Sequence, residues 1–172
     1  KGLDLELVDI ENFNPKNKFD LIYLISVFEH LTDLHLVLNK IRKLINKNGC
    51  LFIKVPGLMN IHNNSFHHFD VLDFLTLPHL HYFTSNTLKN LLSSHGFSII
   101  SSDEQIFQLS KKDEMQNKEL TNFYIQKLSY LKKVNNNIFY LKAKYILKRI
   151  VINSIKLFLG HNLFLKIKKI VQ

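Results

Sequence analysis

Glycine is scarce in this sequence and poorly spaced for a ligand-binding loop. The chain has 172 residues and five glycines, and no two glycines lie two residues apart. In an open parallel sheet, the charged part of a ligand is usually held by a glycine-rich turn that leads into a helix N-terminus. A site of that kind is therefore excluded from these residues. The glycines are Gly2, Gly49, Gly57, Gly96 and Gly160.

Cysteine and long apolar runs are also nearly absent. The single cysteine, Cys50, excludes a disulfide framework, and its place in a predicted buried strand favours a small core residue over a nucleophile. No charge-free apolar run approaches the ~18 residues that a membrane-spanning helix needs, and no signal peptide is visible. These absences predict a cytoplasmic protein in a reducing compartment.

Acidic residues are missing from the last third of the chain. Residues 1–110 contain nine Lys/Arg and eleven Asp/Glu, a net charge of −2, whereas residues 111–172 contain fourteen and three, a net charge of +11. No acid follows Glu119. We interpret residues 1–110 as one domain and residues 111–172 as a basic helical extension. The asymmetry indicates an anionic partner for the extension, either a membrane surface or nucleic acid.

Helical periodicity is clearest at residues 138–159, and Gly160 is expected to end this helix before a short last piece at residues 163–171. The apolar residues fill the side opposite the basic arc, and one interpretation is peripheral contact with an anionic membrane. Packing of that apolar side on the sheet or on a second subunit is the alternative. Nucleic acid is not expected, because the aromatic residues here are not spaced as a stacking platform. The arc comprises Lys142, Lys144, Lys148, Arg149 and Lys156.

The first domain begins with a pattern of alternating strands and helices. Leu5–Val8 is predicted as a strand, and Leu21–Ile25 as a second, buried strand. Thr32-Asp33 provides candidate N-caps for a helix that continues to Asn48-Gly49, and residues 50–55 form the next strand. A helical crossover of this length predicts that the strands on either side of it are parallel. Residues 96–110 predict two further strands joined by a turn at residues 103–104.

Several short segments in this order resemble class I S-adenosylmethionine-dependent methyltransferases, in the branch that acts on small molecules. They are FDLIYL at residues 19–24, Glu29-His30-Leu31, the turn Lys47-Asn48-Gly49, the strand ending at Pro56, and residues 79–100. The resemblance covers residues 3–110 and implies a doubly wound, Rossmann-like α/β sheet. By the family's pattern the glycine-rich loop lies upstream of Lys1. We therefore expect the chain to be the carboxyl-terminal part of a longer protein, inactive by itself.

The resemblance implies S-adenosylmethionine as the cofactor and assigns four residues to it. The Asp9 carboxylate would accept a hydrogen bond from the adenine amine, and Ile10 would pack on the purine face. Ser26 and Val27 would lie beneath the methionine part and the sulfonium. Without the resemblance, Asp9 is better interpreted as a solvated acid in a turn.

Two histidines are candidates for taking a proton from the acceptor. Sugar C-methyltransferases of this branch carry a Glu-His pair before an aromatic Ser/Thr stretch, and the histidine acts as general base. His79 falls on that histidine, and Pro78 replaces the glutamate. The resemblance therefore implies His79, or failing it His30, as the catalytic base. Alternatively, Glu29 serves the next helix as a cap or charge, and His30 packs without a functional role.

Residues 56–84 are expected to cover the acceptor as a lid, with aromatic walls. The expected acceptor-binding residues are Glu29, His67, His81 and Tyr82. The five histidines between residues 62 and 81 are typical of metal binding, but their order fits no regular zinc pattern, so we expect no metal there.

The sequence thus predicts a methyltransferase that uses S-adenosylmethionine and acts on a small molecule, a sugar or a precursor of a bacterial surface glycan. The alternative is a non-catalytic, methyltransferase-like interaction module. The identity of the acceptor and the oligomeric state do not follow from the sequence.

Overall fold

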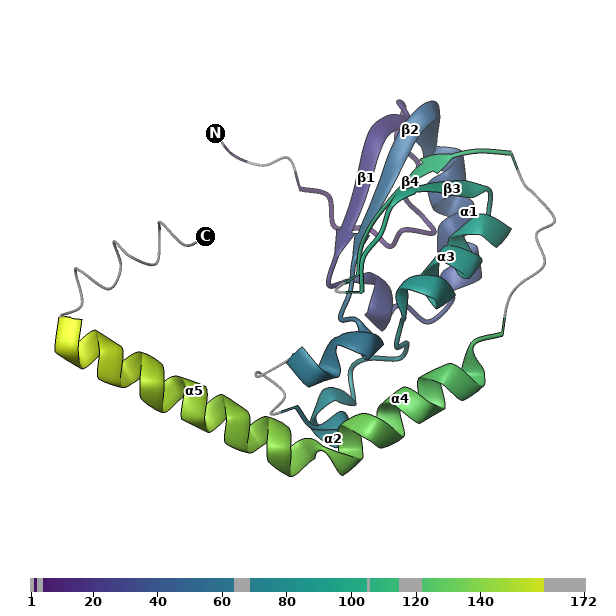
Figure 1. Cartoon of the computed structure of the whole chain (residues 1–172). Coiled ribbons are helices and arrows are strands. Elements are labelled where there is room, and N and C mark those ends of the chain that lie inside the picture. The colour runs from purple at the N-terminus through teal and green to yellow at the C-terminus, as the bar shows by residue number, and fades with distance from the viewer. Residues whose placement is uncertain (1, 3–4, 64–68, 105, 115–121, 160–172) are drawn as a thin grey trace. The chain divides into compact units, whose positions relative to one another are not determined.

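The computed structural model describes residues 2, 5–63, 69–104, 106–114 and 122–159. Its contacts divide the chain into two compact units (Figure 1). The first unit comprises Lys1–Asn60 and Leu75–Lys127, and the second comprises Ile61–Phe74 and Leu128–Gln172. The domain boundary near residue 110 stays a prediction.

The first unit is built on a mixed sheet of four strands in the order β1-β2-β4-β3. β1 (Phe19–Ile25) and β2 (Ile45–Lys54) are parallel, with Leu21 opposite Cys50 and Ile25 opposite Lys54. β4 (Phe107–Lys112) runs antiparallel to both β2 and β3 (Phe97–Ser101). The crossover between β1 and β2 includes the helix α1 (Leu34–Leu44). The prediction of a partial Rossmann-like α/β fold is confirmed.

Capping residues set where the two long helices of this unit begin. The Asp33 carboxylate accepts a hydrogen bond of 2.9 Å from the Leu36 N–H at the start of α1. At the start of α3 (Ser85–Ser94), Thr84 and Thr87 form a reciprocal capping box. Gly96 follows α3 with a φ of 70°, a conformation that glycine adopts without strain. The sequence predicted the start of α1, because a cap is a local signal.

The boundary between α1 and β2 differs from the prediction. The helix ends at Leu44, and the strand begins at Ile45 rather than at Cys50, so the prediction that the helix continues to Asn48-Gly49 is wrong. Ile45 is fully buried and pairs with Phe19 of β1. The Asn46 amide also donates a hydrogen bond of 2.7 Å to the Asp20 carboxylate. Pairing with β1 therefore overrides the helical periodicity.

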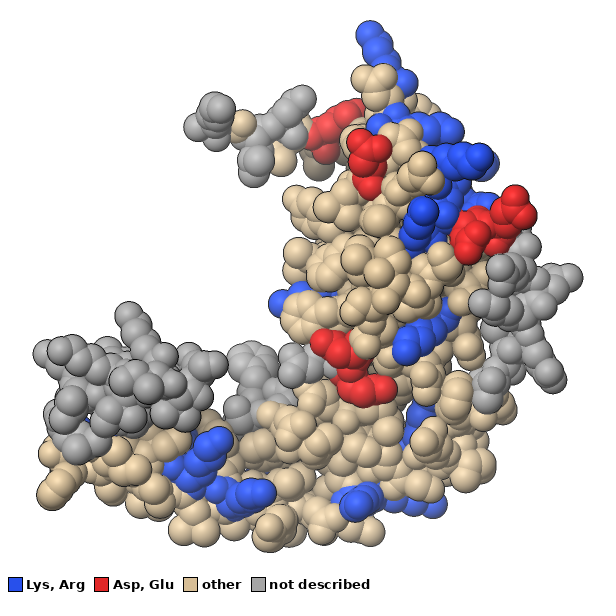
Figure 2. Space-filling model, turned by 45° about the horizontal axis from the view of Figure 1, so that its top comes forward, with Lys and Arg blue, Asp and Glu red and all other residues tan. Residues whose placement is uncertain are grey.

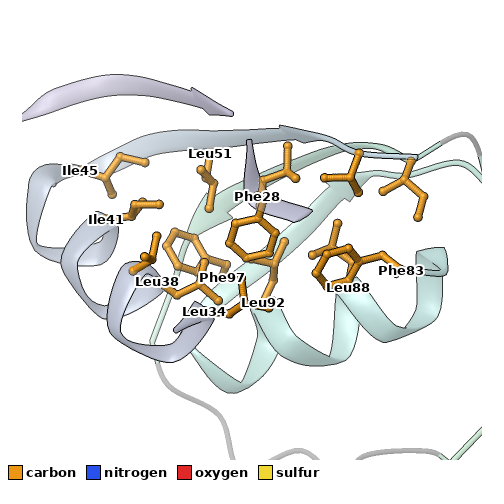
Figure 3. Packing of buried hydrophobic residues seen from close by; sticks show 14 residues of the cluster. Phe28, Leu34, Leu38, Ile41, Ile45, Leu51, Phe83, Leu88, Leu92 and Phe97 are labelled. Atoms are coloured by element: carbon orange, nitrogen blue, oxygen red, sulfur yellow. The ribbon is translucent and has the colours of Figure 1, made fainter. Parts of the chain in front are cut away.

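The core lies on one face of the sheet, where α1 and α3 pack (Figure 3). β1 was predicted to be buried, but only Ile22 and Leu24 pack against this core. The alternate residues Leu21, Tyr23 and Ile25 are 54, 65 and 48% exposed. Because side chains alternate along a strand, a sheet with helices on one face leaves every second residue uncovered. The core cluster is Phe28, Leu34, Val37, Leu38, Ile41, Ile45, Leu51, Ile53, Val55, Phe83, Leu88, Leu92, Phe97 and Ile106.

The predicted strand at Leu5–Val8 is wrong. Residues 5–9 have no regular structure, and Leu5 and Leu7 are exposed. The Asp9 carbonyl instead accepts hydrogen bonds from the N–H groups of Asn12 and Phe13, which close a turn. A strand needs a neighbour for its backbone groups, and the described sheet ends at β1.

The second unit is helical. It includes α2 (Val71–Phe74), α5 (Ile138–Leu159) and most of α4 (Tyr124–Asn136), and the short helix η2 (Leu58–Asn63) spans its border with the first unit. The predicted helix at residues 138–159 is confirmed, whereas Gly160 and residues 163–171 lie outside the described residues. Figure 2 shows Lys and Arg side chains spaced along the surface of α5. None of the described helices combines the length and the apolar character of a membrane-spanning helix.

Candidate active site

The chain turns sharply where β1 ends. Ser26 adopts a φ of 52°, and its N–H donates a hydrogen bond of 2.9 Å to the Lys54 carbonyl. A positive φ in a residue other than glycine costs about 1–3 kcal/mol and is often found at functional sites. The turn leaves Ser26 and Val27 exposed at the carboxyl end of the strand, the edge where open α/β sheets bind ligands.

The short helix η1 (Phe28–His30) follows this turn and is anchored by its first two residues. Phe28 is fully buried and stacks on Phe83 at 5.5 Å between ring centroids. Glu29 is only 1% exposed, and its carbonyl accepts hydrogen bonds from the N–H groups of Leu80 (3.0 Å) and His81 (3.1 Å). These contacts hold the segment around residue 80 against the end of β1.

His30 is oriented by the backbone of this second segment. Its Nδ1 lies 2.8 Å from the Pro78 carbonyl oxygen. Because a carbonyl oxygen can only accept, Nδ1 carries the proton, and Nε2 of the neutral ring offers a lone pair. His30 Nε2 lies 3.9 Å from Glu29 Oε1. The His30 side chain is 39% exposed, so it is within reach of a ligand.

His79 completes a cluster with Glu29 and His30. Its ring meets the His30 ring edge-on at 4.9 Å between centroids. One oxygen or nitrogen atom of each of the three side chains lies within 4.8 Å of the others. Pro78 precedes His79 in the chain, and Glu29, from a different element, supplies a carboxylate near His79. We call Glu29, His30 and His79 the carboxylate-histidine cluster.

Tyr82 lies next to this cluster, whereas His81 does not belong to it. The Tyr82 hydroxyl donates a hydrogen bond of 2.8 Å to the Thr76 carbonyl, and its ring lies 5.9 Å from that of His79. The His81 ring instead lies 6.1 Å from Phe83. His79 and His81 do not lie on a strand, because residues 79–82 have no regular structure. The Leu80 and His81 N–H groups bond to the Glu29 carbonyl rather than to a strand.

The remaining predicted residues are more scattered. Asp9 is exposed in its turn, and Ile10 packs partly against the core and lines a hollow of about 500 Å³ with Glu6, Val8, Phe13 and Phe19. His67 lies outside the described residues. The predicted lid, residues 56–84, is divided between the two units, so a covering role for it stays a prediction.

Sequence reasoning missed the contacts that assemble the cluster. The partner of His30 is the backbone carbonyl of Pro78, 48 positions away. A carbonyl is present at every residue, so the residue type carries no signal for such a contact. The doublets Glu29-His30 and Pro78-His79 were visible in the sequence, but their proximity depends on the fold.

Comparison with known proteins identifies the family. Residues 2–102, more than half of the chain, match the family described as "Methyltransferase domain". The chain belongs to this methyltransferase family. Over 81 residues, 46% of the chain, it is 33% identical to the C-methyltransferase NovU of Streptomyces niveus. The aligned part is 18% of the length of that relative. The carboxylate-histidine cluster lies inside the matched methyltransferase domain.

Proposed function

We propose that the whole protein transfers a methyl group from S-adenosylmethionine to a small molecule, a sugar or a precursor of a surface glycan. The observation that carries this proposal is the carboxylate-histidine cluster at the carboxyl end of β1, inside a methyltransferase domain. The relative named as a C-methyltransferase supports methyl transfer in general and favours carbon as the acceptor atom.

The described residues fit part of the cofactor. S-adenosylmethionine, when bound, supplies an electrophilic methyl group on a sulfonium. Ser26 and Val27 are exposed at the edge of the sheet where the methionine part is expected, and the exposed Asp9 carboxylate can accept a hydrogen bond from an amine. The half-buried Ile10 offers an apolar surface to a purine. The chain has no glycine-rich turn, so we expect these residues to bind the cofactor only weakly by themselves.

The cluster supplies the proton chemistry that methyl transfer needs. His79 accepts the proton that the acceptor loses, and the nearby Glu29 carboxylate stabilises the imidazolium that forms. His30, held by the Pro78 carbonyl, orients the acceptor or takes over as the base. A positioned base typically contributes about 10²–10⁴-fold in rate. The remaining work of the protein is to align the reacting groups and to exclude water.

The test uses the full-length protein, methyl-labelled S-adenosylmethionine and a panel of nucleotide-linked and free sugars. We expect label to move to at least one acceptor. Cofactor binding without transfer to any sugar, amine or hydroxy compound in the panel would favour the non-catalytic interaction module. Full-length protein in which His79 and Glu29 are replaced by Asn and Gln serves as the matched control.

A further inference from the structure

We propose that Glu29, His30 and His79 form a binding site for one divalent ion of the zinc type. The site is contained in the first unit and includes His79, one of the five histidines between residues 62 and 81 for which the sequence predicted no metal. Metal binding does not depend on the proposed methyl transfer, because it involves neither cofactor nor acceptor.

The donor set and its spacing suit such an ion. Two imidazoles and one carboxylate are a common set of three protein ligands for zinc, with a fourth position left for water or a substrate atom. In a tetrahedral site with bonds of about 2.0–2.1 Å, neighbouring ligand atoms lie roughly 3.3 Å apart. The donor atoms of the cluster lie within 4.8 Å of one another, and Glu29 Oε1 and His30 Nε2 are 3.9 Å apart. Side-chain rotations that move these atoms by about an ångström close the site.

The buried Glu29 carboxylate is a second indication, independent of the donor spacing, that a cation binds here. It is 1% exposed, and its Oε2 has no hydrogen-bond partner within the part of the chain that the structure describes. A buried carboxylate oxygen without a partner is costly, and a cation bound beside it removes that cost. The Glu29 backbone is fixed as well, since its carbonyl holds the Leu80 and His81 N–H groups.

The orientation of His30 is that of a metal ligand. Histidines that bind metals usually donate their other ring N–H to a carbonyl or a carboxylate, which fixes the ring and its tautomer. His30 does this with the Pro78 carbonyl at 2.8 Å, which leaves Nε2 directed to the cluster. His79 contacts the edge of the same ring.

The chemistry of the donors selects the class of ion. Imidazole suits Zn²⁺, Co²⁺ and Ni²⁺, whereas Ca²⁺ and Mg²⁺ prefer six or more oxygen ligands. No short sequence motif joins the three ligands, because Glu29 and His30 lie 50 and 49 positions before His79. If the proposed function is correct, a bound ion occupies the lone pairs needed for proton transfer, and zinc then inhibits the enzyme.

The experiment measures metal binding to the metal-free 172-residue chain without S-adenosylmethionine, using calorimetry with Zn²⁺ and visible absorption with Co²⁺. We expect one ion per chain at this site and the absorption bands of four-coordinate Co²⁺. Loss of a residue that hydrogen-bonds to a metal ligand typically weakens metal binding about 10–100-fold, so the loss of a ligand in Glu29→Gln or His79→Asn should weaken it at least as much. The matched control is His81→Asn, which removes a neighbouring histidine outside the cluster and should leave affinity within about 3-fold of wild type.

Two controls test whether Zn²⁺ binds at this cluster rather than elsewhere in the chain. The His35 and His95 rings are 3.0 Å apart between Nδ1 and Nε2, so His35→Asn tests for a competing site. Zn²⁺ should raise the thermal midpoint of the wild-type chain but not that of Glu29→Gln, whose amide preserves the shape of the side chain. Wild-type protein without Zn²⁺ binding, or binding that Glu29→Gln and His79→Asn leave unchanged, would overturn the proposal. Because no cofactor is present, either result leaves the methyltransferase proposal untouched.

Discussion

At the scale of single residues, the carboxylate of the cluster comes from a different element than His79. Pro78, which has no titratable side chain, directly precedes His79 in the chain. Glu29 reaches the same neighbourhood from η1, and its buried carboxylate lies near the imidazoles of His30 and His79. The cluster therefore contains a carboxylate although the residue next to His79 in the chain is a proline.

Replacing His79 by Asn should identify the base. In the full-length enzyme we expect turnover to fall about 10²-fold or more with little change in cofactor affinity, because a general base acts on the acceptor's proton. Single-turnover kinetics and calorimetry with S-adenosylmethionine measure the two quantities. His81→Asn is the control, since the His81 ring packs on Phe83 outside the cluster. If His79→Asn retains turnover within a few-fold of wild type, the role passes to His30 or no base is needed.

At the scale of elements, Arg42 joins α1 to two strands. Its Nη1 donates hydrogen bonds to the carbonyls of Gly96, just before β3, and Asp113, just after β4. The neighbouring Lys112 ammonium donates to the Ile45 carbonyl at 3.0 Å, and its pKa is lowered first by burial and then by repulsion from Lys18 and Arg42. The basic side chains at this end of the sheet thus satisfy backbone carbonyls.

The substitution Arg42→Met should destabilise the first unit by about 1–2 kcal/mol, because hydrogen bonds from a charged donor are among the stronger ones. Chemical denaturation followed by circular dichroism measures this change. Lys43→Met is the control, since Lys43 is exposed, and it should change stability by no more than about 0.5 kcal/mol. Equal effects of the two substitutions would show that the Arg42 contacts contribute little.

The helix α5 is the element for which we propose contact with an anionic membrane. Its residues Ile146, Leu147, Ile150 and Val151 are 55–62% exposed. Four basic residues of the helix line a hollow of about 640 Å³ together with Phe69 and Tyr145. A helix with an exposed apolar face and neighbouring cations is typical of one that lies on an anionic membrane surface. The basic residues are Lys144, Lys148, Arg149 and Lys156.

Co-sedimentation with vesicles tests this contact. Each cation near an anionic leaflet contributes about 1 kcal/mol, so Lys148→Glu with Arg149→Glu should reduce binding to anionic vesicles at least 10-fold. The control pair, Lys47→Glu with Lys111→Glu, makes the same change of charge at exposed positions of the first unit and should have a small effect. Binding should also fall as salt rises. Equal recovery of the wild-type chain in the supernatant with neutral and anionic vesicles would refute the contact.

At the scale of the whole molecule, the sheet of the first unit carries an uncovered apolar face. Leu21, Tyr23 and Ile25 are exposed on β1, on the side opposite the core. Contiguous exposed apolar side chains of this kind are uncommon on monomeric proteins and mark surfaces that another element or chain covers.

We expect the 172-residue chain to bind a hydrophobic fluorescent dye and to self-associate as its concentration rises. The double substitution Leu21→Thr with Ile25→Thr should lower dye fluorescence several-fold and keep the fold, because threonine is well suited to exposed strand positions. Fluorescence and analytical ultracentrifugation measure both effects. Leu77→Thr is the control, since Leu77 is 99% exposed but lies off this face. Unchanged fluorescence in the double variant would place the dye site elsewhere.

The sequence by itself determined the elements whose signals are local. The periodicity of residues 138–159 predicted α5, Asp33 marked the start of α1, and the turn at residues 103–104 separated β3 from β4. Caps, turns and periodicity act over a few residues, so one chain segment is enough to reveal them. Segments within residues 3–110 carried the resemblance to methyltransferases, and the family match confirms a methyltransferase domain there.

Only the tertiary structure decided the features that depend on neighbours distant in sequence. Strand pairing ended α1 at Leu44, and the lack of a pairing strand left residues 5–9 irregular. The placement of helices on one face exposed half of β1. The carboxylate-histidine cluster formed because the Glu29 carbonyl holds the segment around residue 80 at the end of β1. Almost any residue type can make backbone hydrogen bonds of this kind, so the residue types do not predict them. Their geometry is seen only in the folded chain.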